Sequence, residues 1–148
     1  QSLINPYTGI VSLFARLAKQ GQSIPVYEDG QIVRDFVFID DVASAIVAGV
    51  LHSPAAALPY DIGLGERTTI MQVAQTIAGH YGAPAPHVTG QFRDGDVRAA
   101  WADTTHARQA LDWEPRVGVA EGINRLCDWI DAQDGAVPPA PTSTVKEA

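Results

Sequence analysis

Two arginines are the residues of this sequence best suited to bind an anion. Arg34 interrupts an apolar stretch rich in β-branched and aromatic residues, and Arg93 begins the segment Arg-Asp-Gly-Asp. A guanidinium held on a strand suits bidentate capture of a phosphate or carboxylate, and two converging arginines would offset both charges of a pyrophosphate. The alternatives are that Arg34 is a surface residue paired with Asp35 or Glu28, and that the segment after Arg93 is a charged surface turn.

The sequence gives little support for metal or nucleophile chemistry. The four histidines lack the spacing of metal ligands and Cys127 is the only cysteine, so we expect no metal site. Asp94 and Asp96 form only an isolated acidic pair, which is a weak pattern for a cation. Cys127 falls on the apolar stripe of a helix and is interpreted as a core residue. A Gly-x-Ser-x-Gly motif does not occur.

Residues 63–68, Gly-Leu-Gly-Glu-Arg-Thr, imitate the glycine fingerprint of a dinucleotide-binding loop. However, Thr68 replaces the third glycine, and the Ala-Pro-Ala-Pro segment at 83–86 offers no acidic partner for a ribose about twenty residues further on. We therefore interpret residues 63–68 as a strand-to-helix turn and expect no cofactor-binding residue in this chain.

Composition narrows the class of protein. The chain has 148 residues, of which 46% are hydrophobic and 18% charged, as expected for one globular domain with a core. Its formal net charge of −7 and its scattered basic residues disfavour nucleic-acid binding. The sequence has no apolar run long enough to span a membrane. A single cysteine excludes an internal disulfide and fits a reducing compartment, so we expect a cytoplasmic protein.

The candidate arginine at position 34 falls within a stretch with clear local signals. An apolar strand at residues 24–27, a Glu-Asp-Gly turn at 28–30 and a second strand at about 32–39 predict a hairpin, since Gly30 can take the positive φ that such a turn needs. A helix is expected from Val42 through Leu51, capped by Asp40 or Asp41.

Helices are predicted at four further places. An amphipathic helix at 8–20 has Thr8 as a plausible cap and a stripe of Ile10, Leu13, Phe14 and Leu17. A Thr69–Gln72 capping box begins the next helix, which gives way to a loop from Gly79. Asp103 is placed to cap a short helix through Leu111, and a last helix is expected at about 120–132. The remaining expected strands are short, at 58–63 and 98–101.

Alternating strands and helices predict an α/β fold. The helix at 42–52 is apolar on more faces than a free surface helix would be. We expect residues 1–132 to form one substrate-binding portion. Residues 133–148 are expected to be a proline-rich disordered tail, because they carry almost nothing to bury.

Several ordered segments resemble the extended short-chain dehydrogenase/reductase family, which comprises NAD-dependent nucleotide-sugar epimerases and dehydratases. These segments are Asn-Pro-Tyr-Thr-Gly at 5–9, Arg-Asp-Phe-Val-x-x-Asp-Asp-Val-Ala at 34–43, Tyr-Asp-Ile-Gly-Leu-Gly at 60–65, Arg-Asp-Gly-Asp at 93–96, and Trp-Ala-Asp-Thr through Trp-Glu-Pro at 101–115. The opening residues look most like the 4-epimerase branch, which includes the UDP-glucose and dTDP-rhamnose 4-epimerases. Asp112 stands where the family often ends a helix with glycine, and aspartate tolerates that left-handed backbone moderately.

The resemblance implies roles for particular residues in binding a nucleotide sugar. Arg34 and Arg93 match the arginines that bind the diphosphate, and Asp96 matches the acid that holds the ribose. Pro25 and Tyr27 match the apolar and aromatic residues that flank the nucleobase. The residues that match positions near the substrate are Asn5, Thr8 and Gly9.

The resemblance also implies that the chain is the C-terminal part of a longer 4-epimerase, which begins before Gln1. The N-terminal Rossmann domain would bind NAD and carry the Tyr-x-x-x-Lys pair, and neither that pair nor the glycine loop occurs in these 148 residues. We expect a UDP- or dTDP-sugar as substrate, a homodimeric parent, and an inactive, self-associating fragment. The alternatives are a 4,6-dehydratase or decarboxylase, and a non-catalytic binding or assembly module.

Overall fold

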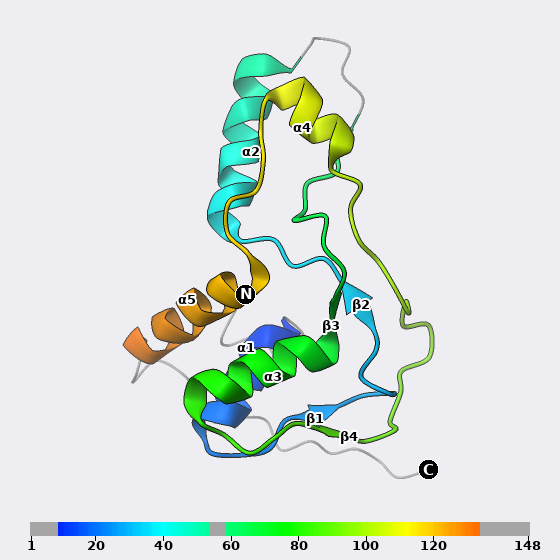
Figure 1. The fold of residues 1–148 in the computed structure, drawn as a ribbon, viewed down its shortest axis with the longest axis vertical. Coiled ribbons are helices and arrows are strands. Elements are labelled where there is room, and N and C mark those ends of the chain that lie inside the picture. The colour runs from blue at the N-terminus through cyan, green and yellow to red at the C-terminus, as the bar shows by residue number, and fades with distance from the viewer. Residues whose placement is uncertain (1–8, 54–58, 134–148) are drawn as a thin grey trace.

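The computed structural model describes residues 9–53 and 59–133. The described elements form two groups along an elongated molecule, joined by extended segments (Figure 1). The helices are α1 (Ile10–Lys19), α2 (Ile39–His52), α3 (Ile70–Tyr81), α4 (Thr105–Leu111) and α5 (Val119–Ala132). The strands are β1 (Pro25–Val26), β2 (Val33–Arg34), β3 (Thr68–Thr69) and β4 (His87–Val88). The predicted α/β class is confirmed.

The main core lies where α1, α3 and α5 pack together beside β1. Ile70, Val73, Ala74 and Ile77 form the buried stripe of α3, and the predicted burial of Cys127 on α5 is confirmed. On α1 the predicted stripe is partly wrong, since Ile10 and Leu13 are exposed. Smaller residues on the adjacent face of α1 are buried instead: Val11, Ala15 and Ala18, together with Phe14. Small side chains let neighbouring helices approach closely, which tertiary packing favours over the bulkier stripe.

The predicted hairpin does not form, although its turn does. Gly30 has a φ of 77° and donates to the Tyr27 carbonyl at 3.1 Å. Beyond this turn each strand has a distant partner: β1 runs parallel to β4, and β2 runs antiparallel to β3. Met71 N–H donates to the Gly30 carbonyl and so draws the chain away from β1. Residue 99 forms only a single bridge with β2, and residues 59–63 form no strand in the part of the chain described.

The predicted boundaries agree closely with the structure for α5 and for the start of α3, whereas the predicted end of α3 at Gly79 is too early. Thr69 and Gln72 form the predicted capping box, and α3 continues past Gly79 to end at Gly82 in the left-handed conformation. For α4, Asp103 accepts from the Thr105 N–H at 3.0 Å, although Thr104 occupies the N-cap position. The predicted Thr8 cap lies outside the described residues, as do residues 134–148 of the predicted tail.

Helix α2 begins three residues earlier than predicted, with Phe38 at the N-cap, so the proposed aspartate cap is wrong. Asp40 and Asp41 lie inside its first turn, where negative charge is favourable. Asp41 is buried, and its carboxylate accepts from the N–H groups of Arg116 and Val117, each at 3.0 Å. This carboxylate therefore joins α2 to the segment that precedes α5.

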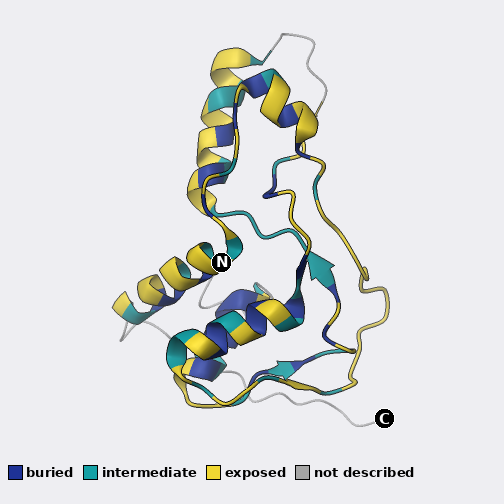
Figure 2. Ribbon diagram, viewed as in Figure 1, coloured by how far each residue is buried: buried dark blue, intermediate teal, exposed yellow. Residues whose placement is uncertain are grey.

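Much of α2 is exposed, as Figure 2 shows. Its exposed apolar side chains are Ile39, Ile46, Val47, Val50 and Leu51, with exposures between 57% for Val47 and 80% for Val50. Contiguous exposed apolar patches on soluble proteins mark interaction surfaces. The expectation from the sequence that this helix carries an unusually apolar face is confirmed.

We expect the 148-residue chain to self-associate through α2. Sedimentation velocity over a range of concentrations should show association, accompanied by binding of a hydrophobic dye. Replacing Ile46 and Val50 together by glutamine should reduce both signals, whereas Val88→Gln, which removes an exposed apolar side chain from β4, should not. A monomer at high concentration that binds no dye would contradict the prediction.

Candidate functional site

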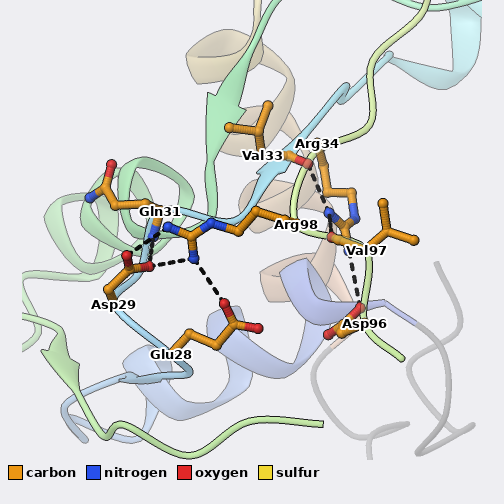
Figure 3. A network of polar contacts seen from close by, with 8 residues as sticks. All are labelled: Glu28, Asp29, Gln31, Val33, Arg34, Asp96, Val97 and Arg98. Atoms are coloured by element: carbon orange, nitrogen blue, oxygen red, sulfur yellow. Dashed lines mark hydrogen bonds and ion pairs between the residues drawn. The ribbon is translucent and has the colours of Figure 1, made fainter. Parts of the chain in front are cut away.

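Arg34 is held by three hydrogen bonds from its side chain. Nη1 donates to the carbonyl oxygens of Val33 at 2.8 Å and Val97 at 2.6 Å, and Nη2 donates to Asp96 Oδ1 at 3.1 Å (Figure 3). The partners considered from the sequence, Asp35 and Glu28, are wrong. Instead the guanidinium is fixed against the loop that carries Arg93 and Asp96.

This arrangement leaves Arg34 able to bind an anion. A guanidinium has five N–H donors, and the three bonds to described residues leave two, one on Nε and one on Nη2. The side chain is 29% exposed, so part of it is accessible to solvent. An anion that binds there would meet a cation whose orientation is already set, but it would share that cation with Asp96.

Arg93 lies on the exposed loop 92–97, beside Tyr27. The Arg93 Cζ atom is 5.7 Å from the centroid of the Tyr27 ring, which is a cation–π distance. Within the loop, the Asp96 N–H donates to the Arg93 carbonyl at 3.2 Å and closes a turn. One short loop thus carries Arg93 to Tyr27 and Asp96 to Arg34, which brings together four residues selected from the sequence.

Of the other selected residues, the structure describes Pro25 and Gly9, and neither forms a hydrogen bond or ion pair with this group. Pro25 is half-buried in β1, paired with His87 of β4. Gly9 precedes α1 with a φ of 80°. Asn5 and Thr8 lie outside the described residues.

Sequence analysis missed a second charged network beside the first. Arg98 donates through Nη1 to Asp29 Oδ1 at 2.7 Å and to Glu28 Oε2 at 2.8 Å, and through Nη2 to Asp29 Oδ2 at 2.6 Å (Figure 3). These bonds, with the Gln31 N–H that also donates to Asp29, hold the pKa of the Asp29 carboxyl well below its usual range. In the sequence, Glu28 and Asp29 are only two acidic residues before a glycine, and Arg98 is about seventy positions away.

Asp35 is a second residue that sequence analysis missed. Its carboxylate accepts from the N–H groups of Leu64 at 2.8 Å, Gly65 at 2.9 Å and Ala102 at 3.2 Å. A Cβ on Gly63 would lie 2.4 Å from Asp35 Oδ2. The carboxylate therefore fills the space beside the glycine turn. The predicted strand-to-helix turn at 63–68 is partly wrong, because no strand precedes it among the described residues, although β3 and α3 follow it.

A hollow of about 620 Å³ lies elsewhere, between α2, α4 and α5, and is lined in part by Asp41, Trp113 and Arg116. Its lining includes neither Arg34 nor Arg93. The described residues contain no group of three or more potential metal ligands. None of the described helices is long and apolar enough to cross a membrane.

Known proteins resemble this chain in sequence and fold. The GDP-mannose 4,6 dehydratase family model matches residues 5–126. The dTDP-L-rhamnose 4-epimerase of Burkholderia thailandensis is 53% identical over 130 residues, which cover 88% of this chain and 36% of that protein. A crystal structure of UDP-glucose 4-epimerase with UDP-glucose, from Thermotoga maritima, superposes with a TM-score of 0.77 at 30% identity, covering 86% of this chain and 41% of that one.

A further solved structure shares these features. The UDP-glucose 4-epimerase of Thermus thermophilus, in complex with NAD, has a TM-score of 0.73 and 30% identity, and the match covers 90% of this chain and 43% of that one. The chain thus spans roughly two fifths of the length of the relatives named here, and it matches the C-terminal part of their fold.

Proposed function

Since the chain belongs to the GDP-mannose 4,6 dehydratase family of nucleotide-sugar epimerases and dehydratases, we propose that it is the nucleotide-sugar-binding part of a 4-epimerase. The observation that carries the proposal is the geometry of Arg34, which is fixed by two carbonyl groups and keeps two donors for an anion. The 53% identity to a dTDP-L-rhamnose 4-epimerase favours a 4-epimerase among the family's reactions.

In this proposal, each selected residue binds a different part of the nucleotide sugar. Arg34 and Arg93 offset the two charges of the diphosphate, and charge-assisted bonds to phosphate are among the stronger hydrogen bonds in proteins. Tyr27 supplies an aromatic face for the base. Asp96, which accepts from Arg34 in this structure, would accept hydrogen bonds from the ribose hydroxyls when the diphosphate binds to Arg34.

Four further residues complete the proposed contacts. Pro25, close to Tyr27 in the chain, flanks the base on its other side. The residues proposed to meet the sugar are Asn5, Thr8 and Gly9. Before the ligand binds, Arg34 is already paired with Asp96. The diphosphate would therefore share the guanidinium with that carboxylate.

NAD is the cofactor we propose for the longer protein, and this chain does not fit it. The Gly-Leu-Gly turn at 63–65 is filled by the Asp35 carboxylate, so it leaves no cradle for a pyrophosphate. We propose that an N-terminal domain of the longer protein binds NAD, carries the catalytic tyrosine and covers the apolar face of α2. Hydride transfer at the sugar C4 and assembly as a homodimer belong to that longer protein, and this chain by itself is inactive.

The proposal predicts that both arginines contribute strongly to nucleotide affinity. In the full-length protein, Arg34→Ala and Arg93→Ala should each weaken UDP or dTDP binding by about 1.5–3 kcal/mol, the range for charge-assisted hydrogen bonds. Calorimetric titration measures this, and the preferred nucleotide identifies the base. Arg125→Ala, which removes an exposed arginine paired with Glu121, is the matched control. Wild-type affinity in both variants, with an intact fold, would disprove the diphosphate site.

A 4,6-dehydratase is the second candidate, since the matching family model is described by that activity. The two reactions differ in product: an epimerase returns a sugar with all its hydroxyl groups, and a dehydratase yields a 4-keto-6-deoxy sugar. Analysis of the product by NMR separates them. Nucleotide binding without turnover of any nucleotide sugar would instead indicate a non-catalytic binding module.

A further inference from the structure

Arg98 lies where the exposed loop 92–97 returns to the sheet. Its carbonyl accepts from Val33 N–H at 3.0 Å, and Ala100 N–H donates to the Val33 carbonyl at 3.1 Å, so the main chain from Arg98 to Ala100 is fixed to β2. The side chain of Arg98 extends the other way, to Glu28 and Asp29 (Figure 3). We call Glu28, Asp29 and Arg98 the clasp.

The clasp joins the loop to the turn that follows Tyr27. The Glu28 N–H donates to the Gln91 carbonyl at 2.7 Å, which attaches the other end of the loop to the same turn. Glu28 has a φ of 51°, a left-handed conformation that a glutamate adopts only when its surroundings impose it. Both ends of the loop are thus tied to a turn whose backbone conformation is itself unusual.

The loop has little else to define its shape. Every residue from 91 to 100 is exposed, so the loop gains almost no stability from a core. Arg34 holds the last two residues of the loop, Asp96 and Val97 (Figure 3). The proposed ligand contacts include Arg34 and Asp96 but none of the clasp residues, so the clasp can support the loop when the ligand is bound.

We propose that Arg98 is a positioning residue for nucleotide-sugar binding, which holds Tyr27 and Arg93 in the arrangement that receives the base and diphosphate. This inference rests on the proposed function of the site. Arg98 acts through the turn and the loop rather than through its own charge, because Glu28 and Asp29 together give the clasp a formal charge of −1. A single exposed ion pair contributes little, but this one is bidentate and has a second acidic partner.

The two roles predict opposite results for Asp29→Ala in the full-length protein. If Arg98 attracted the ligand by charge, removal of the aspartate would expose that charge and tighten UDP or dTDP binding. If the clasp positions the site, Asp29→Ala and Arg98→Ala should each weaken binding, by about fivefold to tenfold. Arg98→Lys, which keeps the charge but cannot bind both carboxylate oxygens in the same way, should recover only part of the affinity.

A double-mutant cycle with Arg93 completes the test. In the Arg93→Ala background, Arg98→Ala should cost clearly less than it does in the wild type, because one of the two side chains that it positions is already gone and only Tyr27 remains. The control is again Arg125→Ala, and thermal unfolding checks that the variants fold. Tighter binding in Asp29→Ala, full rescue by lysine, or independent losses in the cycle would each overturn the inference.

Failure of the inference is distinguishable from failure of the proposed function. If the wild-type protein binds neither UDP nor dTDP, the proposed function fails, and the inference fails with it. If the wild type binds, and Arg34→Ala weakens binding while Arg98→Ala does not, the site stands and the clasp has no positioning role.

Discussion

Replacing Asp35 by alanine should destabilise the chain by about 3–5 kcal/mol, one of the largest losses we expect from a single substitution. The carboxylate accepts three backbone N–H groups, from Leu64, Gly65 and Ala102. Each bond to a charged acceptor contributes about 1.5–3 kcal/mol when buried, and the partial exposure of this site lowers the total. Equilibrium unfolding in urea, followed by tryptophan fluorescence at low protein concentration, measures the loss.

The carboxylate also limits which residue can stand at position 63. In Gly63→Ala the new Cβ would lie 2.4 Å from Asp35 Oδ2 and 2.7 Å from Ala102 Cβ, so the turn must shift. Because one of the two clashes disappears in Asp35→Ala, the double variant should lose less stability than the sum of the single variants. Asp94→Ala, at an exposed position, is the matched control. Additive losses, or an Asp35→Ala variant as stable as that control, would contradict this account.

Local signals in the sequence correctly predicted the structural features that depend only on residues close together in the chain. The capping box of α3 forms between Thr69 and Gln72, and the apolar face of α5 points to the core. Asp112 ends α4 with a φ of 48°, as its tolerance of left-handed backbone allowed. These features need no knowledge of the rest of the chain, because hydrogen bonds and periodicity within one helix determine them.

The errors concern partners that are distant in the sequence. The Glu-Asp-Gly turn indicated a hairpin, but β1 pairs with residues about sixty positions away and β2 with β3. Arg34 and Asp96 were selected separately, and only the structure shows that they bond to each other. Arg98 was overlooked because neither its neighbours nor its spacing indicate that it meets Glu28 and Asp29. Non-local pairing is set by tertiary packing, which local propensity does not encode.

The sequence identified Asp41 as a structurally important residue but assigned it the wrong role. The sequence indicated a helix cap at Asp40 or Asp41, yet both lie within the first turn of α2. The buried carboxylate of Asp41 accepts from Arg116 and Val117 instead, and the Trp113 indole donates to Ser44 Oγ at 2.8 Å nearby. The helix is therefore fixed at its beginning to the segment between α4 and α5, while most of its length remains exposed.

Asp41→Ala should accordingly destabilise the chain by about 3–4 kcal/mol, because two N–H groups lose a charged acceptor, one of them at a buried site. Asp40→Ala is a close control: Asp40 is exposed in the same first turn and meets the helix dipole similarly, so its loss should stay within about 1 kcal/mol. The difference between the two variants in free energy of unfolding, measured in urea, gives the contribution of the hydrogen bonds from Arg116 and Val117 to Asp41 alone. Equal losses would mean that both aspartates act only through the dipole, and that other contacts hold α2 to the segment before α5.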